Sequence, residues 1–144
     1  MKVKLDENLG RRVAQIPLLG KLLIGHGALI LLWSAFCLFA VTIGVLNTYA
    51  NHSSKTEDVV IIVAYGVFGA AALPVGILQI VAGSSLLRNR GRTLAIVALW
   101  TALAAFFLGA VFCAPTSIAL IVFGMIVLMD PAVAAALKPS TNPT

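Results

Sequence analysis

Four apolar runs joined by short polar links constrain this chain more than any other feature of its sequence. The runs cover residues 22–46, 59–87, 93–113 and 117–137. A helix needs about 20 apolar residues to cross the roughly 30 Å of hydrocarbon in a bilayer. The first three runs reach this length, whereas the fourth has 13 residues, Ser117 to Met129, before Asp130. The pattern predicts an all-α integral membrane protein, a four-helix bundle with up-down-up-down topology.

The composition supports a membrane protein over a soluble one. Hydrophobic residues make up 60% of the 144 residues, charged residues only 10%, and the mean hydropathy is +1.04. A soluble domain carries roughly a quarter charged residues, so this chain has too little polar surface to face water on all sides. The net charge of +5 does not indicate nucleic-acid binding, because the positive residues flank the apolar runs and form no basic face.

The distribution of positive charge predicts the orientation in the bilayer. Positive residues in short loops stay on the cytoplasmic side. Nine of the ten lie on one side of the four runs: Lys2, Lys4, Arg11, Arg12, Lys21, Arg88, Arg90, Arg92 and Lys138. Both termini and the link at 88–92 are therefore expected in the cytoplasm. A cleaved signal peptide ending near Ala50 is the alternative, but the apolar stretch before it, about 25 residues, exceeds the 7–15 of such peptides.

The segments outside the runs complete the domain organisation. Residues 1–21 are expected to form a basic cytoplasmic or interfacial segment, either a short helix on the anionic inner leaflet or a frayed tail. Asp130-Pro131 is typical of a helix N-cap followed by proline at the first helical position. It predicts that the fourth element turns into a short interfacial helix ending near Leu137. Residues 138–144 are expected to be a disordered tail.

Small residues recur at helical spacing inside the runs. Gly69, Gly76 and Gly83 are spaced by sevens, which places them on one helix face. In lipid, small residues let helix backbones approach and gain dispersion contacts. Matching small residues in the other runs are Gly27, Ser34, Ala98, Ala102 and Ala105. We expect a tight, antiparallel, left-handed bundle with the second helix near its centre; a dimer face is the alternative.

Gln79 and His26 are the polar residues of most interest inside the runs. A buried amide costs a few kcal/mol when unpaired, so Gln79 is expected to bond a backbone group or hydroxyl of the first or third helix. Recognition of a partner or ligand is the alternative role. His26 is expected to be a core or interfacial histidine. The other histidine, His52, is predicted on the opposite side of the membrane, which excludes bis-histidine ligation within one chain.

Chemistry-bearing motifs are otherwise absent from the sequence. The cores of the spans carry no Asp, Glu, Lys or Arg, whereas ion-coupled transporters place an ionisable group there. The sequence has no nucleophile–base pattern, phosphate-binding loop or zinc signature. We therefore predict a protein that is not an enzyme, with no catalytic residue, no cofactor and no metal.

Part of the chain resembles a family of small bacterial four-span proteins. The residues that carry the resemblance are Leu73-Pro74, the stretch from Gln79 to Arg88, the stretch from Arg90 to Ile96, and Leu128 to Val133. Together they lie within roughly residues 70–137. This chain lacks the aromatic residue of the basic link that the family pattern leads us to expect. The resemblance implies a bacterial inner-membrane location and no particular activity.

Two functions are compatible with these features. The first is a scaffold or accessory subunit of a membrane assembly. Its partners would be another protein within the membrane and the anionic lipids of the inner leaflet, contacted through Arg11, Arg12, Arg88, Arg90 and Arg92. The second is a homo-oligomeric channel or permease for a small solute, with a polar path formed by Gln79, Ser34, Ser84, Ser85 and Thr101.

Overall fold

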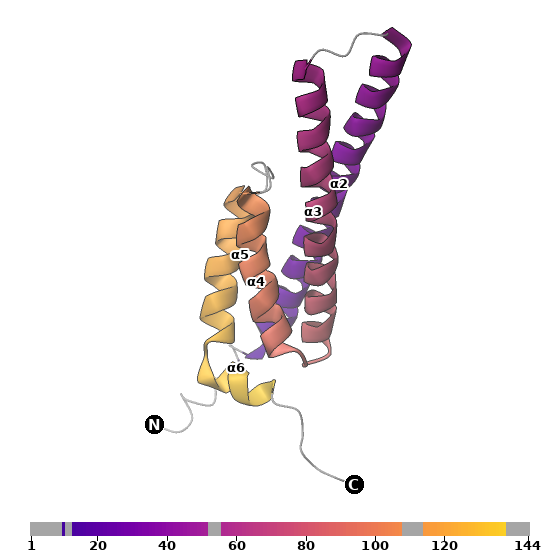
Figure 1. Ribbon diagram of the computed structural model, residues 1–144. Helices are drawn as coiled ribbons and strands as arrows, with labels where there is room; N and C mark the ends of the chain where they lie inside the picture. The colour runs from indigo at the N-terminus through magenta and orange to yellow at the C-terminus, as the bar shows by residue number, and fades with distance from the viewer. Residues whose placement is uncertain (1–9, 11–12, 52–55, 108–113, 138–144) are drawn as a thin grey trace.

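The computed structural model describes residues 10, 13–51, 56–107 and 114–137, and this part of the chain is helical, without a strand. Figure 1 shows the elements, whose bounds are α2 Ile16–Asn51, α3 Thr56–Leu87, α4 Arg92–Phe107, α5 Ala114–Leu128 and α6 Pro131–Ala136. Arg11, Arg12 and the predicted tail at 138–144 lie outside the described residues. The all-α prediction is confirmed.

The helices form two antiparallel hairpins of unequal length (Figure 1). α2 and α3 have 36 and 32 residues, whereas α4 and α5 have 16 and 15. At 1.5 Å per residue, α2 is about 54 Å long and α4 about 24 Å. The described part of the short hairpin therefore packs beside one half of the long hairpin only. We call that half, which holds the α3–α4 turn and α6, the base.

The helices contact one another in a ring. α2 packs on α3, α3 on α4, α4 on α5, and α5 returns to α2. The second predicted helix, α3, was expected near the centre of the bundle. It is not central, because its extensive contacts are with α2 and α4 alone. The main hydrophobic core lies in the base and includes Leu19, Leu23, Leu86, Leu99 and Leu128, all at most 1% exposed.

A heptad of small residues sets the spacing of α2 and α3. Gly20 faces Gly83, Gly27 faces Gly76, and Ser34 faces Gly69. A Cβ atom added at Gly83 would lie 2.6 Å from the Gly20 carbonyl oxygen, and one at Gly27 would lie 2.8 Å from the Gly76 carbonyl oxygen. The Ser34 hydroxyl donates to the Gly69 carbonyl oxygen at 2.6 Å. Side chains at these positions would force the two helices apart.

A second close contact joins α4 to α5. A Cβ atom at Gly124 would lie 2.6 Å from Leu99 Cδ1, so this glycine leaves room for the leucine. Ala98 and Ala102 are fully buried on the inner face of α4. Ala105 belongs to the same helix, and its side chain lies outside the described part. The alanine face of α4 thus packs in the base, while the glycine face of α3 packs on α2.

The link between α3 and α4 is short and ends α3 sharply. After Leu87, Asn89 has φ 52° and Gly91 has φ 79°, the left-handed conformation that commonly ends a helix. Arg92 then begins α4, and its Nε donates to the Leu128 carbonyl oxygen at 3.0 Å. A guanidinium is well suited to this position, because the last carbonyl groups of a helix carry partial negative charge. Arg92 therefore caps α5.

The fourth element is divided in two. α5 ends at Leu128, and α6 begins at Pro131, the residue that the sequence marked as a helix start. α6 runs across the base (Figure 1), where Val133 and Leu137 are buried in the core cluster. The change of direction at Asp130-Pro131 therefore also closes the lower end of the bundle with the chain's own apolar side chains.

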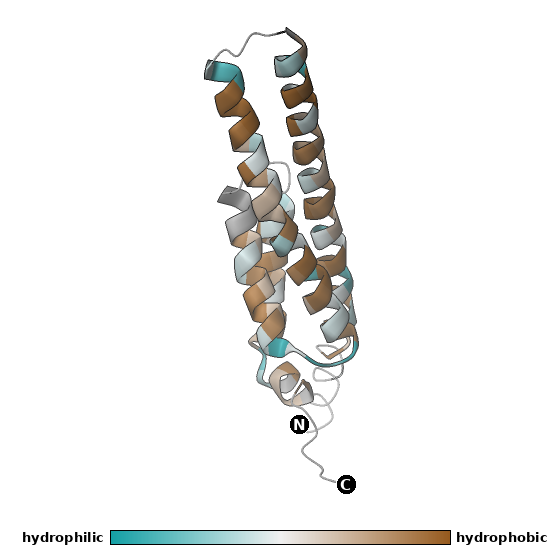
Figure 2. Cartoon of the chain, turned by 45° about the vertical axis from the view of Figure 1, so that its right-hand side comes forward, coloured by the Kyte–Doolittle hydropathy of each residue, from teal (hydrophilic) through white to brown (hydrophobic). Residues whose placement is uncertain are grey.

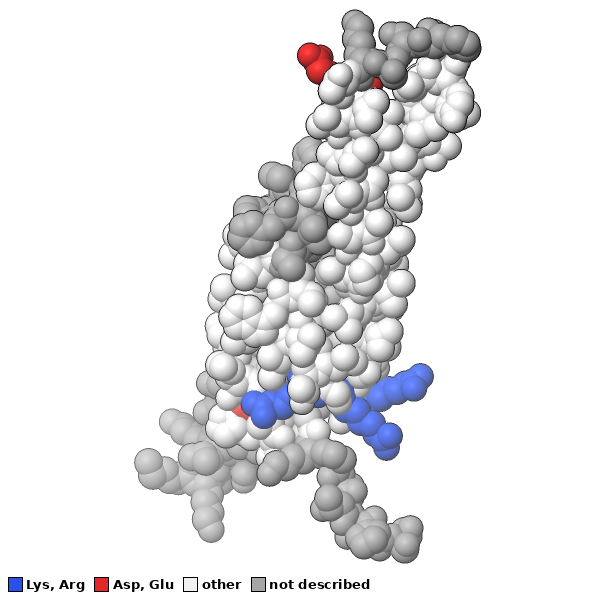
Figure 3. Space-filling model, in the orientation of Figure 1, with Lys and Arg blue, Asp and Glu red and all other residues white. Residues whose placement is uncertain are grey.

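Charged and apolar side chains are segregated along the long axis. Figure 3 shows Lys and Arg gathered at the base and Asp and Glu at the opposite, outer end, apart from Asp130. The helices between these ends consist largely of apolar residues (Figure 2), and large apolar side chains such as Leu32, Phe36 and Phe39 are exposed. By length and composition, α2 and α3 can each cross a membrane, and α4 and α5 are shorter apolar helices.

The tight glycine contact makes a prediction about stability. Gly83→Ala should lower the free energy of unfolding by about 1–3 kcal/mol, because its Cβ meets backbone atoms that can move only if α2 and α3 separate. The measurement is equilibrium unfolding in mixed micelles with increasing dodecyl sulfate. Gly25→Ala is the matched control, since nothing lies within 4 Å of a Cβ built there. Equal losses in both variants would contradict the argument.

Candidate functional site

Three buried polar side chains from three helices meet inside the bundle. His26 comes from α2, Gln79 from α3 and Ser117 from the first turn of α5, and their exposed fractions are 5%, 0% and 2%. His26 and Gln79 are adjacent because the Gly27–Gly76 contact fixes the register of their helices. We call these three residues the His26 network.

The imidazole ring of His26 joins the other two members. Its Nδ1 lies 2.7 Å from Gln79 Oε1, and its Nε2 lies 2.9 Å from Ser117 Oγ. The amide oxygen can only accept, so Nδ1 carries the hydrogen and donates to Gln79. In the neutral ring Nε2 then accepts from the Ser117 hydroxyl. The network thus links α5 to the α2–α3 hairpin through two hydrogen bonds at one ring.

Gln79 has a further polar atom to offer, because its Nε2 is buried without a hydrogen-bond partner among the described residues. An unpaired buried donor carries a desolvation cost of about 1–3 kcal/mol.

A groove runs beside the His26 network, between α2 and α5. It has a volume of about 480 Å³, and His26 forms part of its wall. The other lining residues are mostly apolar and include Gly25 and Leu29 of α2 and Ala119, Leu120 and Phe123 of α5. Lys21 is the one charged residue that lines it. α2 and α5 make the least extensive contact of the four neighbouring helix pairs, which is why space remains there.

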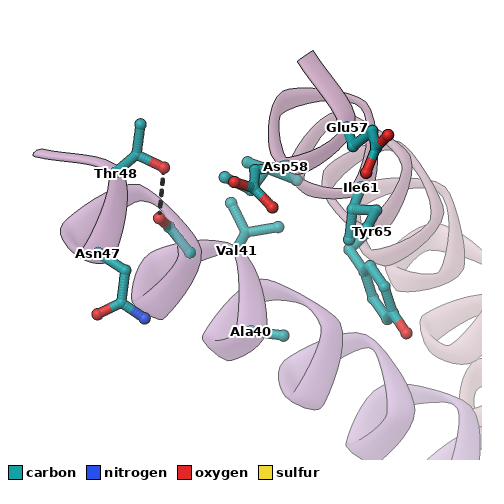
Figure 4. A pocket seen from close by; sticks show the side chains of 10 residues that line it. Ala40, Val41, Asn47, Thr48, Glu57, Asp58, Ile61 and Tyr65 are labelled. Carbon is teal, nitrogen blue, oxygen red and sulfur yellow. Dashed lines mark hydrogen bonds between the residues drawn. The ribbon is translucent and has the colours of Figure 1, made fainter. Parts of the chain in front are cut away.

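A larger cleft opens at the outer end, where α2 and α3 diverge (Figure 1). Its volume is about 790 Å³. Figure 4 shows Asp58 projecting from α3 into the gap and Asn47 on the α2 side. Its floor is lined by small and aliphatic residues such as Ala40 and Val41. The cleft therefore combines an apolar floor with a rim that carries negative charge. We call it the outer cleft.

The structure gives Gln79 a different partner from the expected one. The sequence led us to expect a backbone group or hydroxyl of a neighbouring helix; the partner is the imidazole of the first long helix. Arg88 and Arg90 are exposed at the base, whereas Arg92 is half-buried and engaged with the end of α5. Gly69, Gly76 and Gly83 contact α2, as described above.

Four of the five polar side chains considered for a channel form hydrogen bonds within the protein. Ser34 donates to Gly69 on the neighbouring helix, whereas Ser84 donates to the Val81 carbonyl and Thr101 to the Ala98 carbonyl of their own helices. Gln79 belongs to the His26 network. Each of these groups is thus engaged at a separate place in the bundle. Within the described ranges, no group of three His, Cys, Asp or Glu side chains is placed to hold a metal ion.

Two residues that build or position the site were missed from the sequence. Ser117 was treated as the start of the fourth run, and its hydrogen bond to His26 joins positions 91 residues apart. Gly20 was left outside the first predicted helix, 22–46, whereas the observed helix α2 begins at Ile16. The spacing of Gly20, Gly27 and Ser34 by sevens was a signal that could have found Gly20.

Comparison with protein-family models, curated proteins and solved structures finds no match.

The His26 network makes a prediction that a double-mutant cycle can test. Gln79→Leu removes the acceptor of His26 Nδ1, and His26→Leu removes the donor, so each variant should unfold more easily. The two changes should be coupled by about 1 kcal/mol, the usual size of a hydrogen bond between membrane helices. Unfolding in mixed micelles gives the four free energies. Additive losses would mean that the 2.7 Å contact contributes nothing.

Proposed function

We propose that this chain is a four-span integral membrane protein with both ends in the cytoplasm. In this arrangement the base faces the cytoplasm, and α4 and α5 cross together with the longer α2 and α3. The uncharged part of α3, Val59 to Leu87, is about 43 Å long at 1.5 Å per residue, close to the 40–45 Å thickness of a bilayer with its headgroup regions. The positive charge at the base supports the orientation.

Within that membrane we propose a non-enzymatic scaffold or accessory subunit of a larger assembly. The outer cleft is the observation that carries this proposal. In that half of the long hairpin, α2 and α3 diverge beyond the described part of the short hairpin (Figure 1). A cleft of about 790 Å³ with an apolar floor offers a surface on which another membrane segment can pack. Its polar rim favours a protein segment over a lipid chain.

The partner suggested by this surface is a membrane protein with a basic residue near the outer interface. Glu57 and Asp58 begin α3 at the rim, and Asn47 lies on the facing helix. A Lys or Arg placed there would be attracted by both carboxylates. Apolar side chains of the same segment would pack on Ala40 and Val41. A bacterial inner membrane is the location that the family resemblance favours.

The topology makes a prediction for a chain in which Cys37 and Cys113 are replaced by serine. A cysteine introduced at Asn47 or at Ala114 should react with a membrane-impermeant maleimide added to intact cells. A cysteine at Asn89, in the basic link, should react only after the membrane is made permeable. Labelling of position 114 from the cytoplasmic side would show that α4 and α5 do not cross.

Site-specific crosslinking tests the scaffold role. A photoreactive amino acid at Ile61, which is exposed and lines the outer cleft, should give one discrete product with another membrane protein in native membranes. The charge reversal Asp58→Lys should abolish that product, because it repels the basic residue expected of the partner. The same photoreactive group at Val81, exposed on α3 away from the cleft, is the control. A product containing only this chain, or one unaffected by Asp58→Lys, would contradict the proposal.

A further inference from the structure

We infer that the groove between α2 and α5 is a binding site for one anionic phospholipid, with its phosphate at Lys21 and an acyl chain beside His26. The inference rests on the membrane placement proposed above and is independent of any protein partner. Three observations carry it: the cause of the groove, the glycine that keeps it open, and the charge at its end.

The groove exists because His26 and Ser117 hold α2 and α5 apart. Glycines close the gap between α2 and α3, whereas an imidazole ring and its hydrogen bond to a serine fill the inner side of the α2–α5 gap. The outer side of that gap is left as a space of about 480 Å³, within the 300–1,000 Å³ of ligand pockets in proteins. The 2.9 Å hydrogen bond forms part of the structure behind the groove and prevents the two helices from collapsing into it.

Gly25 keeps the groove open towards His26. It is exposed, and a Cβ built on it would meet nothing within 4 Å. The other glycines of the first half of α2, Gly20 and Gly27, are both in tight contact with α3. Helix packing therefore explains those two and does not explain Gly25. The small size of Gly25 matters for the groove, because any larger side chain at this position would occupy the space beside His26.

The lining identifies the class of ligand. Leu29, Leu120 and Phe123 offer no hydrogen bonds, and both nitrogens of His26 are already engaged. Such walls suit a hydrocarbon chain. Lys21 lies at the base, because its neighbour Gly20 packs against Gly83 and Leu87 near the end of α3. There it can pair with a phosphate while its stem lies along the apolar wall. A phospholipid with net negative charge matches both ends of the groove.

Native mass spectrometry of the purified full chain tests the inference, with dioleoylphosphatidylglycerol as the probe and dioleoylphosphatidylcholine as the uncharged comparison. The wild type should retain one phosphatidylglycerol at least tenfold more tightly than phosphatidylcholine. Inorganic phosphate should not displace it, which distinguishes a lipid site from a free-phosphate site. Lys21→Gln should reduce the preference for phosphatidylglycerol to near the phosphatidylcholine value.

Variants that fill the groove provide the decisive comparison. Gly25→Leu should weaken phosphatidylglycerol binding at least tenfold, and Ala119→Leu, which fills the groove from α5, should do the same. Ala28→Leu is the matched control, because Ala28 is exposed on α2 and does not line the groove. Equal binding by the wild type and both filling variants, or equal retention of the two lipids by the wild type, would overturn the inference. A protein that binds the lipid but fails the crosslinking test would separate this site from the scaffold role.

Discussion

The close approach of α2 and α3 is the contact on which the rest of the structure depends. In the membrane placement proposed above, lipid provides no hydrophobic driving force for apolar helices to associate, and dispersion contacts between closely spaced backbones hold them together instead. Gly20, Gly27 and Ser34 meet Gly83, Gly76 and Gly69 at intervals of seven residues, which is close to two helical turns. The repeat holds the two helices in one register. That register brings His26 next to Gln79, because each lies within one turn of the Gly27–Gly76 contact.

The His26 network extends this register to the short hairpin. The hydrogen bond from His26 Nδ1 to Gln79 fixes the orientation of the imidazole ring. This orientation directs Nε2 towards α5, where it is hydrogen-bonded to the Ser117 hydroxyl. Buried polar groups that hydrogen-bond one another favour a single arrangement of their helices, because any other arrangement would leave a donor or acceptor unpaired in an apolar interior. The base is then completed by apolar packing of Leu99 against Gly124 and by α6, which buries Val133. Polar contacts thus orient the two hairpins, and apolar contacts fill the space between them.

The two open spaces of the molecule have different physical origins. The α2–α5 groove remains because an imidazole and a serine, not two glycines, separate those helices. The outer cleft remains because the pairing of small residues with one another ends at Ser34 and Gly69. Further out Gly44 meets the larger side chain of Ile62, and the two helices diverge. The first space has apolar walls and a lysine at its end, and the second has an apolar floor and carboxylates at its rim. Their chemistry suits a lipid and a protein segment, respectively.

The sequence by itself determined the helical class, the end-to-end separation of charge, the start of α6 at Pro131 and the importance of Gly69, Gly76 and Gly83. These features are local: apolar run length, proline and glycine positions, and charge at run ends act within one helix. Only the tertiary structure decided which helix the glycines face, that Arg92 caps α5, and that His26, Gln79 and Ser117 meet. Hydrogen bonds between residues 53 and 91 positions apart depend on the relative rotation and register of three helices. No single run contains that information, because a helix presents the same residues on its surface whichever neighbour packs against it.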